Sequence, residues 1–396
     1  MIYKNLSYVA ISFFYINIIG YFFHFYVSRK LGPALYGEFM VLYSIYLTMA
    51  NISGIVGNVA VKKIVENINN KYETLRFLRI FGVVTGIIIS VFLVTGCKDV
   101  LHFLNIGNRS SVYLIAFGIL ILFPTSLEKS FLQSTKQFGF FSILNSAELT
   151  IRLVMAILFL YFGLKVFGAL LSSVVSIFIS LAVLLYKNNN IMGKINKIPI
   201  KNILYLMLYI SPGGVMVYLD SIFIKKMFDP TTAGLYAAFS VLGKAVLFLC
   251  LTLNTVFFPE FISLRSNINK LFKMTIKSNF LVFAIFILSI VGVSLSGKEL
   301  FLIVFGAKYT MAFKYLPYYL LALLPLTLNI YFMSIFTALE KHLIIMYANF
   351  LIYLCGFVFL RFKTIDQYFL YIGITNLIFY LFYLGLFTKL KIMYNN

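Results

Sequence analysis

Twelve long apolar runs dominate this chain and decide what it can fold into. A transmembrane helix needs roughly 20 predominantly apolar residues, and each run comes close to that length. The bilayer interior offers the backbone no hydrogen-bond partners, so a spanning run must pair its own amide and carbonyl groups as an α-helix. The predicted fold class is therefore an all-α polytopic membrane protein with about 12 transmembrane helices. The runs cover residues 7–27, 38–60, 80–97, 111–127, 141–162, 166–186, 203–224, 232–258, 278–296, 315–338, 343–360 and 366–388.

The composition supports a membrane protein and excludes several other classes. Of the 396 residues, 62% are hydrophobic and 11% are charged, and the mean hydropathy is +0.97. Soluble domains carry about 45–50% apolar and about 25% charged residues, so a soluble enzyme, a disordered chain and a disulfide-rich secreted module are excluded. The few His and Cys residues are scattered and form no CxxC pair, so we predict no metal and no cofactor. They are His24, His102, His342, Cys97, Cys250 and Cys355.

The net charge of +21 would suggest a nucleic-acid partner in a soluble protein. Here the Lys and Arg residues lie mostly in short gaps between apolar runs, as is typical of the loops of a membrane protein. We therefore predict no nucleic-acid partner. Alternate gaps carry unequal numbers of them. Positive residues favour the cytoplasmic side, and the bias places both termini in the cytoplasm of a protein that crosses the cytoplasmic (inner) membrane.

The short gaps also bear on catalysis, because they leave no room for an extramembrane domain. No GxxxxGK[ST] loop is present to hold the phosphates of a nucleotide. The chain is therefore not expected to be an enzyme. A membrane-embedded glycosyl- or acyltransferase is the alternative, and it would need paired acidic or His residues at a membrane face. Asp99 with His102 is the close pair available, and a solvated loop explains it better.

The two halves of the chain resemble each other. Pro33, Gly37 and Phe39 follow the first run at the same spacing as Pro230, Gly234 and Tyr236 follow the seventh. Proline starts a helix well, and a small residue four positions later lets helices approach closely. Six helices per half give both halves the same orientation, as in repeats related by an axis along the membrane normal. The predicted domains are residues 1–190 and 203–396, each a six-helix bundle, joined by a cytoplasmic linker at 191–202.

Several charged or polar residues fall inside predicted spans, where a charge costs about 2.5–3.5 kcal/mol on insertion scales. Asn145, Glu148 and Arg152 recur at helical spacing on one face of the fifth run, and Lys244 lies deep in the eighth. Asn145, Arg152 and Lys244 are predicted to contact an anionic substrate in an aqueous cavity. Glu148 is either a cation site or only the ion-pair partner of Arg152 one turn away, and Lys244 could instead extend to the interface. Asp220 is either a cation site or the partner of a nearby base.

Two further features are ambiguous. Arg29 could receive a phosphate, although an outer loop charge is the simpler interpretation. Pro212, Gly213 and Gly214 interrupt the seventh run, because proline removes a hydrogen bond and glycine loosens the backbone. We predict a hinge there, with a fixed kink as the alternative.

Three segments in order resemble a known family. They are Leu31-Gly32-Pro33-x-x-Tyr36-Gly37-x-Phe39, then Asp220-Ser-Ile-Phe with Gly234-Leu-Tyr-Ala-Ala, and finally Leu302-Ile-Val-Phe-Gly306-Ala-Lys-Tyr309 before Leu316-Pro317. Together they are similar to segments of the polysaccharide-unit (O-antigen-type) flippases of the multidrug/oligosaccharidyl-lipid/polysaccharide exporter superfamily.

The resemblance implies two six-helix bundles around a central cavity that works by alternating access. It implies a polyprenyl-diphosphate-linked oligosaccharide as cargo, for surface polysaccharides such as the lipopolysaccharide O-antigen. Membrane lipids, H⁺ or Na⁺, a polysaccharide polymerase and glycosyltransferases are the further partners it suggests. A cation-coupled multidrug exporter of the same superfamily is the alternative. It would favour an acidic cavity, and only Glu148 and Asp220 are available within spans.

Overall fold

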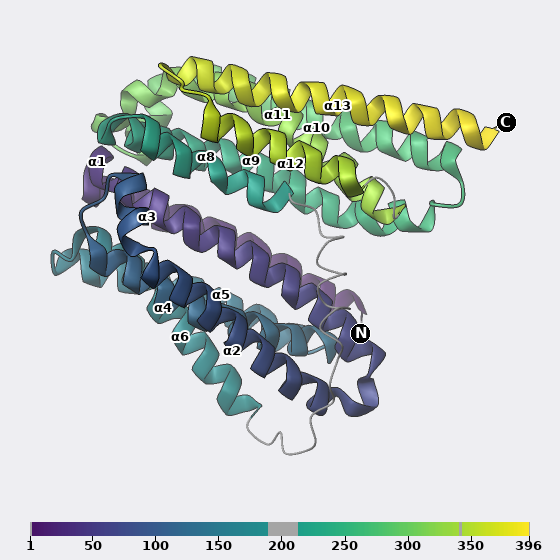
Figure 1. Cartoon of the computed structure of the whole chain (residues 1–396), viewed down its shortest axis with the longest axis horizontal. Helices are drawn as coiled ribbons and strands as arrows, with labels where there is room; N and C mark the ends of the chain where they lie inside the picture. The colour runs from purple at the N-terminus through teal and green to yellow at the C-terminus, as the bar shows by residue number, and fades with distance from the viewer. Residues whose placement is uncertain (1, 189–212, 340–342, 396) are drawn as a thin grey trace. The chain divides into compact units, whose positions relative to one another are not determined.

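The computed structural model describes residues 2–188, 213–339 and 343–395 (Figure 1). Throughout these residues the chain is helical with short connections and contains no strand, which confirms the all-α class. The first helices are α1 (Ile2–Glu66), η1 (Ile68–Asn70), α2 (Lys71–Thr95), α3 (Cys97–Leu104), α4 (Arg109–Ser134), α5 (Phe138–Tyr161) and α6 (Lys165–Lys187). The later helices are α8 (Gly213–Met227), α9 (Pro230–Ser263), α10 (Ile268–Val304), η2 (Ala307–Tyr315), α11 (Leu316–Ala338), α12 (Leu343–Phe359) and α13 (Ile365–Asn395).

The helices agree well with the apolar runs. Nine helices of the described chain are long and apolar enough to cross a membrane, and α12 is a shorter apolar helix. α1 contains the first two predicted runs, which meet at a bend where Gly32 has φ 72° and ψ 171°. The predicted run 203–224 begins outside the described residues, and its second part forms α8. The short helix α3 was not predicted, because its eight residues are too few to form an apolar run of spanning length.

Contacts between helices divide the chain into two compact units. The first contains α1 to α6 together with Tyr218–Gly234, and the second contains most of α9 and all of α10 to α13. Within the first unit, α4 packs against α1, α2, α5 and α6, and most of its side chains are buried. α4 therefore occupies the centre of its unit.

Small residues set the spacing between α2 and α4. Gly82 and Gly86 stand one turn apart on α2 and face Pro124 and Leu120 of α4. A Cβ atom on Gly86 would lie 2.9 Å from the carbonyl oxygen of Leu120, closer than real side chains allow. This is the small-xxx-small pattern by which membrane helices approach closely. The contact is one reason why α2 lies along α4.

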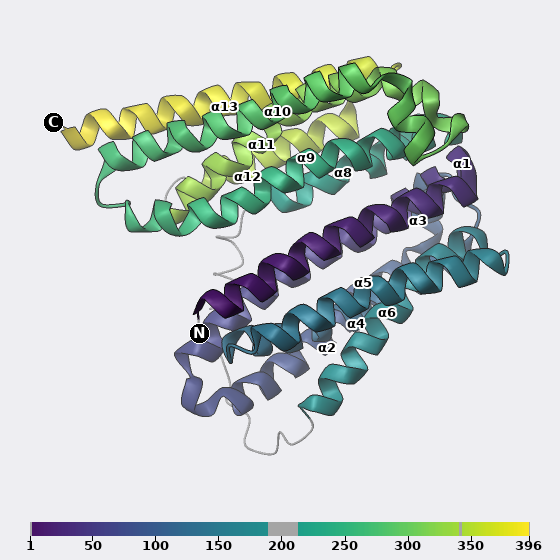
Figure 2. The same ribbon diagram turned by 180° about the vertical axis from the view of Figure 1, so that it is seen from behind.

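In the second unit, α11 has the central position. It packs against α10, α12, η2 and α13, and Figure 2 shows α13 and α10 running side by side with it. Polar groups inside this unit are paired across helices. The side-chain amide of Asn329 donates to both the backbone and the side-chain oxygen of Asn376, and the Tyr331 hydroxyl donates to the carbonyl of Cys250 at 2.6 Å. Such hydrogen bonds stabilise helix contacts where no water is available.

Candidate functional site

A chain of polar contacts joins α1, α4 and α5 inside the first unit. Lys129 Nζ on α4 lies 2.7 Å from Glu148 Oε2 on α5. One turn further along α5, Arg152 Nη2 lies 3.6 Å from the other carboxylate oxygen of Glu148. Arg152 Nη1 also donates a hydrogen bond of 2.8 Å to the hydroxyl of Tyr43 on α1. We refer to Lys129, Glu148, Arg152 and Tyr43 as the ion-pair network.

The ion-pair network carries an excess of positive charge. Glu148 and Arg152 are buried, at 7% and 8% residue exposure, and Lys129 is partly exposed. One carboxylate therefore bridges two cations, and the Nε atom of Arg152, which is also buried, has no hydrogen-bond partner in the described part of the chain. Removing one member of a buried ion pair leaves an uncompensated charge, which is why such groups hold each other in place. The predicted pairing of Glu148 with Arg152 is present, with Lys129 as a second partner.

Lys129 also lines a pocket of about 510 Å³ within the first unit. We call it the polar pocket. Its wall contains three side-chain amides and two hydroxyl groups besides the ammonium, and two aromatic rings complete it. The polar members are Asn51, Asn58, Gln133, Ser126, Ser130 and Lys129, and the aromatic members are Phe141 and Tyr218. Gly54 belongs to the same wall, and a Cβ atom placed on it would meet nothing within 4 Å. The pocket is therefore open beside this glycine.

Neutral hydrogen-bonding groups beside one cation are suited to a ligand rich in hydroxyl groups that also carries a negative charge. Amide side chains can donate and accept, hydroxyls can do the same, and an ammonium donates three hydrogen bonds. No three His, Cys, Asp or Glu side chains lie close enough to hold a metal ion anywhere in residues 2–188, 213–339 and 343–395.

The other sequence-predicted site residues are distributed over both units. Asn145 is half-buried on α5, one turn before Glu148. Arg29 is exposed near the bend of α1. Asp220 is buried on α8, where it accepts hydrogen bonds from the amide and hydroxyl of Ser221 at 2.6 and 3.1 Å. Lys244 is buried on α9 in the second unit. Within the predicted set, Glu148 and Arg152 are in direct contact with each other.

The predicted hinge falls partly outside the described residues. Pro212 is the residue that lies outside them. Gly213 and Gly214 are the first two residues of α8. The hinge therefore stays a prediction.

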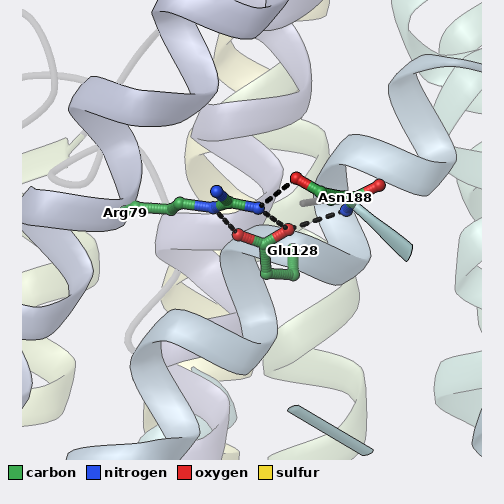
Figure 3. Close-up of polar contacts among 3 residues, drawn as sticks. All are labelled: Arg79, Glu128 and Asn188. Carbon is green, nitrogen blue, oxygen red and sulfur yellow. Dashed lines mark hydrogen bonds and ion pairs between the residues drawn. The ribbon is translucent and has the colours of Figure 1, made fainter. Parts of the chain in front are cut away.

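A second buried ion pair stabilises the first unit and was not predicted (Figure 3). Two nitrogens of Arg79 on α2, Nε and Nη2, contact the two oxygens of Glu128 on α4. Asn188, just after α6, donates from its side-chain amide to Glu128 at 2.8 Å and accepts from Arg79 with its carbonyl oxygen at 3.4 Å. Glu128 is fully buried. Three helices are therefore joined by one carboxylate, which we call the Glu128 cluster.

Sequence reasoning missed Lys129 and Glu128 for a common reason. Both follow directly after the apolar run 111–127 and read as the start of a loop, but α4 continues to Ser134. The signal in the sequence was the pair of opposite charges at Glu128 and Lys129. Neighbouring residues on a helix point in different directions, so the two side chains can pair with different helices. Glu128 faces α2, and Lys129 faces α5.

Comparison with solved structures defines the class of fold. An inward-facing multidrug resistance MATE family transporter of the MOP superfamily is similar with a TM-score of 0.77 and 14% identity over 94% of each chain. An outward-facing structure of such a transporter gives 0.64 and 14% identity, over 98% of this chain and 96% of that one. A MOP superfamily transporter from Pyrococcus furiosus, described by a reversed polarity of its binding pocket, gives 0.59 and 14%, over 98% and 95%. The chain therefore has the MATE-like fold.

The family profile narrows this class. The profile described as polysaccharide biosynthesis protein matches residues 2–265. No curated protein matches the chain. The protein therefore belongs to the polysaccharide biosynthesis protein family, and its long apolar helices make it a multi-pass membrane protein with the MATE-like fold.

Proposed function

We propose that this protein is a flippase that moves a polyprenyl-diphosphate-linked oligosaccharide across the cytoplasmic membrane for surface polysaccharide synthesis. The polysaccharide biosynthesis family and the MATE-like fold support the coarser statement, a polysaccharide-related exporter. The observation that carries the finer one is the polar pocket, in which uncharged amides and hydroxyls surround a single ammonium. The hydroxyl groups of a glycan can hydrogen-bond to these amides and hydroxyls, because each hydroxyl can both donate and accept.

Lys129 supplies the charge that such a substrate requires. A diphosphate or an acidic sugar in a low-dielectric site is costly unless a cation pairs with it. Glu148 holds Lys129 at the pocket wall, and Arg152 supplies a second positive charge to the same carboxylate. An anion that reaches Lys129 would therefore meet a network with one more cation than anions. Phe141 and Tyr218 offer ring faces beside it for the apolar faces of a sugar.

The remaining predicted contacts keep their roles in this proposal. Lys244 and Arg29 are the proposed contacts for the diphosphate, and Asn145 is a further hydrogen-bonding contact. Asp220 is proposed as an ion-pair or cation site, and Pro212 to Gly214 as the hinge. H⁺ or Na⁺ is the proposed coupling ion. Both termini lie in the cytoplasm in this scheme, and a polymerase and glycosyltransferases work with the protein.

The charge of the polar pocket weighs against a drug exporter for organic cations. Such a substrate would need an unpaired carboxylate, whereas the carboxylate of Glu148 already has two cationic partners. Lys129 at the wall would repel a cation and attract an anion. A glycolipid substrate with a negative charge therefore fits the pocket better than a cationic drug.

The test fills the polar pocket without disturbing its wall. Gly54→Leu places a side chain into the space where a Cβ atom meets nothing within 4 Å. Gly20→Leu, on the same helix and equally free of contacts at Cβ, is the matched control. Surface polysaccharide is measured in cells that carry only the variant, and the amount of folded protein is measured in parallel.

We expect Gly54→Leu to lower surface polysaccharide about tenfold or more, as loss of about 1.4 kcal/mol of substrate binding would, with normal protein levels. Gly20→Leu should leave it unchanged. Normal polysaccharide in a folded Gly54→Leu protein would refute the role of the pocket. Normal polysaccharide after deletion of the whole gene, together with increased drug sensitivity, would refute the flippase and favour the multidrug exporter.

A further inference from the structure

The second unit carries a long apolar groove that the proposed function does not use. The groove lies between α11 and α13 and has a volume of about 840 Å³. Large, exposed apolar side chains form its walls, among them Tyr318 and Leu321 on α11 and Leu370 and Leu377 on α13. The space between these two walls is open and mostly apolar. We call it the α11–α13 groove.

Small residues at the floor of the α11–α13 groove explain why it exists. Gly373 on α13 faces Ala322 on α11, and a Cβ atom on Gly373 would lie 3.7 Å from the Cα of Ala322, an ordinary van der Waals distance. The helix backbones can approach there because neither residue extends beyond Cβ. The larger residues on either side stand above this contact and enclose the groove.

Two opposite charges mark one end of the α11–α13 groove. Lys314, just before α11, and Asp366, in the first turn of α13, both line it. Both side chains are exposed, and neither takes part in an ion pair within the part of the chain that the structure describes. Lys314 Nζ lies 4.6 Å from the ring centre of Tyr315, which directs the ammonium toward the groove end without neutralising it. The groove therefore has a charged end and an apolar body.

The length of the α11–α13 groove matches one leaflet of a bilayer. It extends along α13 from Asp366 to Leu377. Eleven residues of helix span about 16 Å at about 1.5 Å per residue. Half of a hydrocarbon core that is about 30 Å thick is about 15 Å. A lipid whose headgroup lies at the charged end would therefore place its acyl chain along the whole groove.

We propose that the α11–α13 groove binds a phospholipid with a phosphate and a primary ammonium, as in phosphatidylethanolamine. The phosphate pairs with Lys314, and the ammonium pairs with and donates to Asp366. Phosphatidylglycerol has no cation for Asp366 and is repelled by its carboxylate. The trimethylammonium of phosphatidylcholine has no N–H to donate, so its pairing with Asp366 is weaker. This site is separate from the polar pocket, and its occupant is a membrane lipid and not the transported glycolipid.

The sequence provides a clean reporter, because the chain contains no tryptophan. Tyr318→Trp places the only tryptophan of the variant in the groove, at a residue that is already 60% exposed. The purified protein is reconstituted into phosphatidylglycerol/phosphatidylcholine vesicles with rising amounts of phosphatidylethanolamine that carries brominated chains, which quench tryptophan on contact. Phe92→Trp on α2, at a 76% exposed side chain three residues from a helix end, reports contact with bulk lipid.

We expect half-maximal quenching of Tyr318→Trp at about a tenfold lower mole fraction of brominated phosphatidylethanolamine than for Phe92→Trp, equivalent to about 1.4 kcal/mol. Brominated phosphatidylcholine and phosphatidylglycerol should quench the two reporters alike. Adding Lys314→Ala or Asp366→Asn to Tyr318→Trp should remove the preference, and Asp366→Asn should increase quenching by phosphatidylglycerol. Gly373→Leu, which fills the groove, should abolish selective quenching in a protein that remains folded.

Equal quenching of both reporters by phosphatidylethanolamine would overturn the proposal, as would a preference that survives both charge variants. Relief of quenching by an equimolar polyprenyl phosphate would assign the groove to the carrier lipid instead. A tryptophan shielded from every brominated lipid, with shielding that increases with protein density, would assign it to a second copy of this chain. None of these readouts measures transport, so they are independent of the outcome for the flippase.

Discussion

Lys129 and Glu148 lie on different helices, and their charged atoms are 2.7 Å apart inside the first unit. Glu148 stands ten residues into α5, about 15 Å along the helix at about 1.5 Å per residue, and therefore lies well inside a membrane-spanning segment. A charge at that depth is stable only beside a partner. The contact thus fixes α4 against α5 and holds the ammonium at the wall of the polar pocket.

Loss of Glu148 should destabilise the protein more than loss of Lys129. Glu148→Gln leaves the buried Arg152 and the partly exposed Lys129 without their anion, and breaking a buried pair costs about 3–5 kcal/mol. Lys129→Met leaves Glu148 paired with Arg152 and should cost less. The thermal midpoint of the purified protein measures both. Glu66→Gln, which removes the exposed partner of Lys63, is the control and should cost about 0–1 kcal/mol. Equal effects of Glu66→Gln and Glu148→Gln would contradict this account.

The Glu128 cluster should require an arginine at position 79. The two contacts from Nε and Nη2 to the carboxylate need a planar fork, which a lysine ammonium cannot supply. Arg79→Lys should lower the free energy of unfolding by about 1.5–3 kcal/mol, the range for a hydrogen bond to a charged group. Arg76→Lys, on the exposed face of the same helix, is the matched control. A thermal midpoint that is equally affected by both would show that the fork has no special role.

Gly32 should not tolerate a side chain. Its φ of 72° and ψ of 171° lie in a region that is essentially restricted to glycine. Gly32→Ala should therefore cost about 1–3 kcal/mol. Gly20→Ala, inside the regular part of the same helix, should be neutral or stabilising, because alanine lowers the entropy of the unfolded chain. The thermal midpoint should therefore fall in Gly32→Ala and should stay the same or rise in Gly20→Ala. A stable Gly32→Ala protein would mean that the bend can be made without a positive φ.

Asp229 should give the protein a stability that depends on pH. It lies before α9, outside the membrane-spanning segments. Hydrogen bonds from the Thr232 hydroxyl and from the amides of Thr232 and Thr231 lower its pKa. A carboxyl group whose folded pKa lies below its unfolded value, about 3.9, stabilises the folded state above that pH. The stabilisation is lost as the pH falls through the folded pKa.

Asp229→Ala should therefore lower the thermal midpoint at pH 7, by the equivalent of about 0.5–2 kcal/mol for an N-terminal helix cap. The difference from the wild type should become smaller as the pH is lowered below about 4. Asp229→Asn keeps an acceptor oxygen and should lose only the pH-dependent part. A constant difference between Asp229→Ala and the wild type from pH 7 to pH 3 would contradict the capping role.

The helices were predictable because an apolar run inside the hydrocarbon can satisfy its backbone hydrogen bonds within itself only as an α-helix. The length of each apolar run is therefore enough to identify a span. The same reasoning cannot reveal which helix faces which. Glu148 and Arg152 were found because their spacing lies within one helix. Lys129 was not, because its contact with Glu148 depends on the packing of α4 against α5. The residues of the polar pocket were missed for the same reason, since the pocket forms only where α1 and α4, which supply most of them, pack together with α5 and α8.

The bend at Gly32 has a consequence for how the first two spans of α1 can move. A loop of several residues would let the two helical segments move independently. Here a single non-helical residue, Gly32, joins them, and the next residue is Pro33, whose φ is fixed by its ring. Two rotatable backbone bonds thus govern the angle between the segments. Any tilt of the first span must be passed on to the second or absorbed at that single joint.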